Sequence, residues 1–142
     1  MRGFIALSKN WMFLIFGLVS FAFLSCSEDT VDNIGRDTAL NIIRANKWFD
    51  VVRTVSVAGQ ADVSETLVAD GENLEFKSDN FAYVYAGAGQ TRSFPYTLET
   101  NKRMVFDGKT YEVQESIIQT VTRLTLVNNE GNIKTTIVFR RR

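Results

Sequence analysis

The alternation of apolar and polar residues over most of the chain predicts β-strands. In the run 72–77, for example, Leu74 and Phe76 share one side, whereas Glu75 and Lys77 share the other. Successive side chains of a strand point to opposite faces, so each such run has one face for a core and one for solvent. Further runs of this kind lie at 92–99, 103–107, 110–114, 123–126 and 136–140.

Turn-forming residues separate these runs, as expected for short antiparallel strands. Roughly eight strands in about 105 residues predict an all-β fold, an antiparallel meander closed into a barrel. A two-sheet sandwich is the alternative, and pairing between the first and last strands distinguishes the two. In the first strand, Phe49 and Val51 lie opposite in parity to Trp48 and Val52, which predicts a bulge near Asp50.

The segment before the strands has a different pattern. Thr38–Asn46 places Leu40, Ile42 and Ile43 on one side with Thr38 as a helix cap, which predicts one or two helical turns. Residues 27–37 are polar and acidic without apolar periodicity, which predicts a tether without regular structure.

The first 25 residues have the pattern of a secretory signal peptide. Arg2 and Lys9 precede the apolar run Trp11–Leu24. At a rise of 1.5 Å per residue this run spans only ~21 Å, short of the ~30 Å hydrocarbon core of a bilayer. An uncleaved membrane anchor is the alternative, if Phe4–Leu7 lengthens the run.

The only cysteine, Cys26, ends the sequence FLSC. This sequence resembles the lipobox of bacterial lipoproteins, although Phe23 stands where leucine is usual. The resemblance implies cleavage before Cys26 and acylation of its thiol and amine, and two or three acyl chains anchor a protein durably. An ordinary cleavage site with an incidental cysteine is the alternative. Ser27–Asp29 resembles the tag that sends some Gram-negative lipoproteins to the outer face of the outer membrane, and a plain linker explains it too.

Three short motifs, Asn46-Lys47-Trp48, Tyr111-Glu112-Val113 and Phe139-Arg140-Arg141, occur in this order along the chain. Their order resembles that of small lipocalin-like domains of bacterial (Gram-negative) lipoproteins, with Asn46 in place of the family glycine. The resemblance implies that Trp48 packs over the closed end of the barrel. Strand parity counted from an inward Phe139 turns Arg141 inward, where its cation would lie over the indole of Trp48. Three solvated terminal arginines are the alternative.

Together these patterns divide the chain into a lipoprotein signal peptide (1–25), an acidic flexible tether from lipidated Cys26 (26–37) and a lipocalin-like β-barrel domain (38–142). We expect an exported outer-membrane lipoprotein, at the cell surface or the periplasmic face. The lipid on Cys26 is then its contact with the membrane.

The composition argues against several functional classes. Lysine plus arginine and aspartate plus glutamate both number 16, and residues 26–142 carry slightly more acid than base, so we expect no nucleic-acid partner. Histidine is absent and the single cysteine cannot build a zinc site, so we expect no metal and no cofactor. Gly87–Gly89 lacks the remainder of any nucleotide-binding motif and reads as a hairpin turn. No spacing singles out a pair of carboxylates, and we predict that the protein is not an enzyme.

Tyrosines are the candidate ligand-binding residues. Tyr83 and Tyr85 form a row at strand spacing with Phe81, and Tyr96 and Tyr111 are expected to join them along the barrel interior. Their hydroxyls would orient a ligand against apolar walls, and ordinary core packing is the alternative.

We therefore expect non-catalytic binding of a small apolar or amphipathic ligand. The alternative is a filled barrel without a small ligand, which binds or inhibits an envelope protein partner through an exposed apolar patch. Arg53, in phase with Val51 and Val55, is either a buried partner of an anion or exposed, and we favour exposure.

Overall fold

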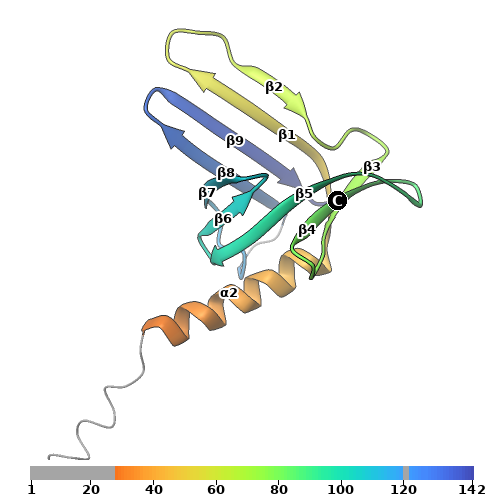
Figure 1. Cartoon of the computed structure of the whole chain (residues 1–142), viewed down its shortest axis with the longest axis vertical. Helices are drawn as coiled ribbons and strands as arrows, with labels where there is room; N and C mark the ends of the chain where they lie inside the picture. The colour runs from red at the N-terminus through yellow and green to blue at the C-terminus, as the bar shows by residue number, and fades with distance from the viewer. Residues whose placement is uncertain (1–27, 120–121) are drawn as a thin grey trace, which may run out of the picture. The chain divides into compact units, whose positions relative to one another are not determined.

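The structure, a computed structural model, describes residues 28–119 and 122–142 (Figure 1). The predicted signal peptide and Cys26 lie outside the described residues. Within the described residues, one helix, α2 (Glu28–Ala45), precedes nine strands. The strands are β1 (Lys47–Val57), β2 (Val63–Thr66), β3 (Glu72–Phe76), β4 (Phe81–Ala86), β5 (Gly89–Thr100), β6 (Arg103–Phe106), β7 (Lys109–Val113), β8 (Arg123–Glu130) and β9 (Ile133–Arg140).

The strands form an antiparallel sheet that closes on itself. Around the ring the order is β1-β3-β4-β5-β6-β7-β8-β9, and β9 pairs back with β1. Eight strands thus make a closed barrel, and β2 is an additional strand paired with residues 52–55 of β1. Because the first and last strands pair, the predicted barrel is confirmed.

β1 changes register at Asp50. Phe49 pairs with Arg140, but Val52 pairs with Val138, so β1 contains one residue more than its partner between these points. Asp50 has a φ of 50°, in the left-handed region that aspartate enters more readily than most residues. The bulge predicted from the parity of β1 is confirmed.

Aromatic side chains fill the centre of the barrel. Phe76 lies with its ring centre 4.8 Å from Tyr96 and 5.7 Å from Phe139, and Phe139 lies 5.5 Å from Phe106. Most of these contacts are edge-to-face, the arrangement that the ring quadrupoles favour. The large rings leave little room for other inward side chains.

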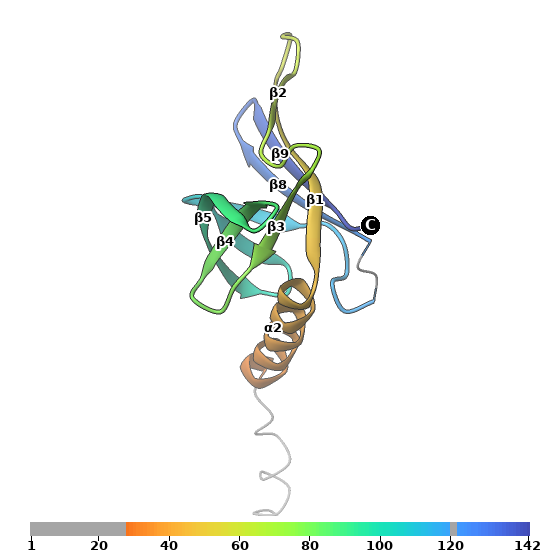
Figure 2. The same ribbon diagram turned by 90° about the vertical axis from the view of Figure 1, so that its right-hand side faces the viewer.

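The C-terminal half of α2 packs against the barrel, at the end from which β1 starts (Figure 2). Ala39 and Ile43 are fully buried and belong to the same core as the strands. The indole N–H of Trp48 donates to the carbonyl of Ile43 at 3.0 Å. Arg44 donates to the hydroxyl of Tyr96 at 2.7 Å. These contacts fix the C-terminal half of the helix on the barrel.

The helix is longer than the sequence pattern predicted. It begins at Glu28 and has 18 residues, so residues 28–37, predicted as a tether without regular structure, are helical. The composition argument counted few apolar residues but did not weigh the acids at the start of the segment.

The two residues expected to close the barrel have different environments. Trp48 is fully buried, and its ring packs against Phe76 and Phe139. Arg141 is exposed and follows Arg140, the last residue of β9, so it lies just beyond the strand from which its orientation was predicted. The pairing of Arg141 with Trp48 stays a prediction.

Candidate functional site

The end of the barrel away from α2 is the candidate site, and we call it the mouth. There the second half of β1 lies between β2 and β9, and these strands extend past the short β6–β7 hairpin (Figure 1). Thr135, Ile137 and Phe139 of β9 are buried, so the residues paired with them face inward as well. By this register the inner face of the mouth carries Arg53, Val55 and Val57 of β1, Val63 and Glu65 of β2, Asn128 of β8, and Ile133 and Thr135 of β9.

Arg53 crosses the mouth. Its guanidinium lies 2.9 Å from the carboxylate of Asp107, in the turn between β6 and β7, and 3.4 Å from that of Glu65 on β2. The Arg53 side chain is 21% exposed. Arg53 is therefore a half-buried partner of two anions, and the expectation that it is exposed was wrong. The Arg53–Asp107 ion pair connects β1 to the β6–β7 hairpin, which is not a neighbour of β1 in the ring.

Two buried polar atoms near the mouth have no hydrogen-bond partner among the described residues: Nε of Arg53 and Oδ1 of Asn128. The amide nitrogen of Asn128 donates to the carbonyl of Thr110 at 2.9 Å, which orients its side chain. An unsatisfied buried polar group costs about 1–3 kcal/mol, so such atoms usually meet water or a ligand. These two atoms are one unpaired hydrogen-bond donor and one unpaired acceptor.

Tyr111 is the buried tyrosine of this region. Burial raises the pKa of its phenol, and the positive charge of Arg53 partly opposes that rise. The negative charges of Asp107 and Glu130 raise the pKa of Tyr111 further. The phenol therefore stays protonated at neutral pH. Its interaction with the Arg53 charge places the two side chains in one electrostatic environment.

Apolar side chains surround these polar groups on the solvent side. Val63 is 67% exposed and Ile133 is 38% exposed, and Val55 and Val57 are half-buried. Exposed apolar residues gathered on one face are typical of binding sites. The inner face of the mouth is amphipathic, because it carries these apolar residues together with Arg53 and Asn128.

A pocket of about 250 Å³ opens on the side of the barrel between β7 and β8. Tyr111 and Asn128 line it together with Thr110 and Val127. β7 and β8 are paired at Glu112–Val127 and Val113–Leu126, below this opening.

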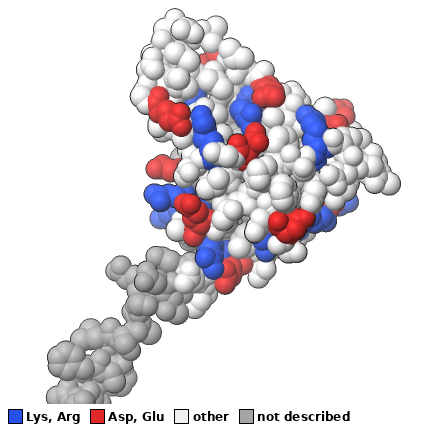
Figure 3. Space-filling view, viewed as in Figure 1, with Lys and Arg blue, Asp and Glu red and all other residues white. Residues whose placement is uncertain are grey.

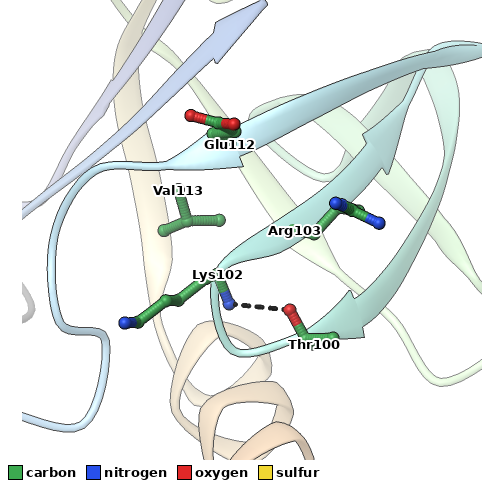
Figure 4. A pocket seen from close by; sticks show the side chains of 5 residues that line it. All are labelled: Thr100, Lys102, Arg103, Glu112 and Val113. Atoms are coloured by element: carbon green, nitrogen blue, oxygen red, sulfur yellow. Dashed lines mark hydrogen bonds between the residues drawn. The ribbon is translucent and has the colours of Figure 1, made fainter.

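A larger depression, of about 420 Å³, lies on the outside of β6 and β7 (Figure 4). Its wall includes Lys102, whose backbone N–H donates to the hydroxyl of Thr100 at 3.2 Å. The side chains of Lys102, Arg103 and Glu112 point in different directions (Figure 4). Since its charged groups do not converge, this depression is a weaker candidate than the mouth.

The four predicted tyrosines do not come together. Tyr96 and Tyr111 are buried inside the barrel. Tyr83 and Tyr85 lie on the outer face of β4, because their neighbours Ala82 and Val84 are the buried residues of that strand. The prediction of one inward row of tyrosines is therefore wrong, and of the four only Tyr111 lies at the mouth.

The site residues that sequence reasoning missed are Asp107 and Asn128. A signal for Arg53 was present, since it shares the parity of the inward valine Val55. Nothing in the sequence indicated that its partner lies in the Asp107-Gly108 turn, because this contact depends on closure of the ring.

Comparison of the chain with protein-family models and with curated proteins found no match. In residues 28–119 and 122–142, no group of three or more acidic, cysteine or histidine side chains is placed to hold a metal ion. Among the described residues, no helix is both long and apolar enough to cross a membrane. On the face seen in Figure 3, acidic and basic side chains are interspersed.

Proposed function

We propose that the protein binds a small amphipathic ligand at the mouth of its barrel and does not transform it chemically. The observation that carries the proposal is the pair of buried, unpartnered atoms, Nε of Arg53 and Oδ1 of Asn128, beside exposed apolar residues. A ligand with both a hydrogen-bond acceptor and a donor would satisfy these atoms. Its apolar part would cover Val63 and Ile133.

The packing of the core supports a small ligand rather than a long one. Phe76, Phe106 and Phe139 fill the centre of the barrel, so a ligand has room only above them. The Arg53–Asp107 ion pair crosses the same space and has to shift or accept the ligand as a further partner. A carboxylic acid, amide or hydroxyl on a short apolar group meets these demands.

Native mass spectrometry of the protein purified gently from its own host tests this proposal. We expect a retained small molecule that is lost on denaturation. An Arg53→Met variant should retain much less of it, since the variant keeps the apolar stem but removes the guanidinium. Arg123→Met is the matched control, because Arg123 is an exposed arginine that also pairs with a carboxylate, Glu115, and lines neither of the two pockets described above. A bare polypeptide mass for the wild-type protein contradicts the proposal.

The filled core also supports a second candidate, a protein-binding module of the cell envelope. The fully buried aromatic cluster leaves the centre of the barrel without space, and β2 is exposed along its whole length. Co-purification of a stoichiometric protein partner with a bare barrel would favour this function over ligand binding.

We further propose that the protein is a lipid-anchored lipoprotein of the bacterial envelope, with a lipocalin-like domain. The proposal rests on the FLSC sequence at Cys26 and on the closed eight-stranded barrel that follows it. Intact mass of the native protein should show cleavage before Cys26 and two or three acyl chains. Cys26→Ala should leave the precursor unprocessed, and an unacylated Cys26 in the mature wild-type protein would refute the anchor.

A further inference from the structure

The outer face of β4 carries a row of three aromatic side chains. Phe81, Tyr83 and Tyr85 alternate with the buried residues of the strand. The ring centres of Phe81 and Tyr83 are 6.2 Å apart, and those of Tyr83 and Tyr85 are 6.4 Å apart. Phe81 is 40% exposed, although burial of a phenylalanine is worth about 1.5–3 kcal/mol. We call these three residues the aromatic platform.

Short polar side chains flank the platform on the neighbouring strands. On β5, Ser93 pairs with Tyr83, and Gln90 pairs with Tyr85. On β3, Asn73 pairs with Tyr85, and its Oδ1 atom is buried without a hydrogen-bond partner. Hydrogen-bonding groups therefore lie on both sides of the rings and on the same face of the sheet.

The charges next to the platform are compensated within the protein. Glu75, which pairs with Tyr83 across the strands, forms ion pairs with Lys77 and with Lys47. The hydrogen bond from Lys77 lowers the pKa of Glu75, so the carboxylate stays ionised and paired. Asp79 accepts a hydrogen bond from the hydroxyl of Tyr83. A partner for this face therefore needs no net charge.

The platform is held in place by the turn between β3 and β4. The carboxylate of Asp79 also accepts the backbone N–H of Phe81 at 3.1 Å. The backbone N–H of Lys77 donates to the carbonyl of Phe81 at 2.9 Å. The rings are thus ordered before any partner arrives, which reduces the entropy lost on binding.

We propose that the aromatic platform binds neutral carbohydrate chains. A pyranose ring has an apolar C–H face that packs on an aromatic ring, and hydroxyls at its edge that need donors and acceptors beside that ring. The platform offers both on one face of the sheet, with ring planes tilted by 30° between Phe81 and Tyr83 and by 51° between Tyr83 and Tyr85. Of the residues paired with the three rings on β5, only Pro95, opposite Phe81, is aliphatic, and Ser93 and Gln90 are polar. The site is independent of the mouth, since the inward residues of β4 are Ala82 and Val84.

Affinity electrophoresis tests the proposal with the full chain in a detergent that has no sugar headgroup. The probes are soluble neutral polysaccharides (mannan, xylan, mixed-linkage glucan and dextran) and one anionic polysaccharide, pectate. We expect at least one neutral polysaccharide to retard the wild-type protein. The double variant Tyr83→Ala/Tyr85→Ala should bind about tenfold more weakly or worse, since it loses two stacking rings. Tyr83→Phe/Tyr85→Phe keeps the rings and should keep most of the binding.

Two further variants make the result specific. Phe81→Ala removes the most exposed ring without touching the tyrosines, and serves in place of the double variant if that variant fails to fold. Arg53→Met alters the mouth and should leave retardation unchanged, so failure of the platform is distinguishable from failure of the proposed ligand site. The proposal is overturned if no neutral polysaccharide retards the protein, if only pectate does, or if folded variants without the rings bind as well as the wild type.

Discussion

Replacement of Ile43 by alanine tests whether α2 and the barrel unfold as one unit. Ile43 is fully buried, and its carbonyl accepts the indole N–H of Trp48. The substitution removes three carbon atoms, worth roughly 2.4 kcal/mol at ~0.8 kcal/mol each. The cavity that remains adds to this, so we expect a loss of about 3–4 kcal/mol. For a domain of this size that loss lowers the melting temperature by roughly 10–15 °C.

Ile34→Ala is the matched control within the same helix. Ile34 is 64% exposed, so its truncation removes little buried surface. Any change of intrinsic helix propensity is the same for both substitutions, and the difference between them isolates the contact with the barrel. We expect the control to stay within about 0.5 kcal/mol of the wild-type protein.

Urea unfolding followed by tryptophan fluorescence measures both variants. The chain contains two tryptophans, and in a Trp11→Phe background the signal comes from Trp48 alone. The free energy of unfolding follows from the midpoint and the slope, which should be equal in the two variants. Equal midpoints for the Ile43 and Ile34 variants would mean that the helix detaches before the barrel unfolds. The assignment of α2 to the core would then be wrong.

Three further predictions are measured by urea or thermal unfolding followed by far-UV circular dichroism, because one of the variants lacks the Trp48 signal. Trp48→Phe removes the hydrogen bond to the carbonyl of Ile43 and should cost about 1–3 kcal/mol, and an unchanged midpoint would contradict it. Glu75→Gln should lower the free energy of unfolding by up to about 1 kcal/mol at pH 7. Lysine contacts lower the folded-state pKa of Glu75, so this cost is present above its ordinary pKa of 4.5 and disappears as the pH falls through the lower folded value. A cost independent of pH would refute that origin. If Arg141 packs on Trp48, Arg141→Ala lowers the melting temperature more than Arg140→Ala, and equal effects refute the pairing.

The barrel was predictable because alternation along a strand is a local property. The bulge at Asp50 followed from the same reasoning, since the parity of Trp48 and Val51 conflicts without it. Periodicity does not state which of the two faces of a strand is buried. For β4 the larger residues, Tyr83 and Tyr85, suggested the wrong face. The interior is already filled by phenylalanines of other strands, so only the small side chains Ala82 and Val84 fit inward.

The mouth was not predictable because it is made of long-range contacts. Arg53 and Asp107 are far apart in the sequence, and only closure of the ring brings them together. The predicted length of α2 was wrong for a different reason. Its first turns have few apolar residues, and we interpreted low hydrophobicity as absence of structure, whereas the helix is fixed on the barrel only further along, at Ala39 and Ile43.

The pairing of β1 with β9 has a consequence for the order in which the protein folds. β9 follows every other strand of the ring in the sequence, so the ring cannot close until residues 133–140 are free to fold. Contacts between such distant segments form slowly, and until then β1 and β8 each present an unpaired edge. A chain that stops before Ile133 would therefore be an open sheet rather than a slightly smaller barrel, exposed to edge-to-edge association with its own copies.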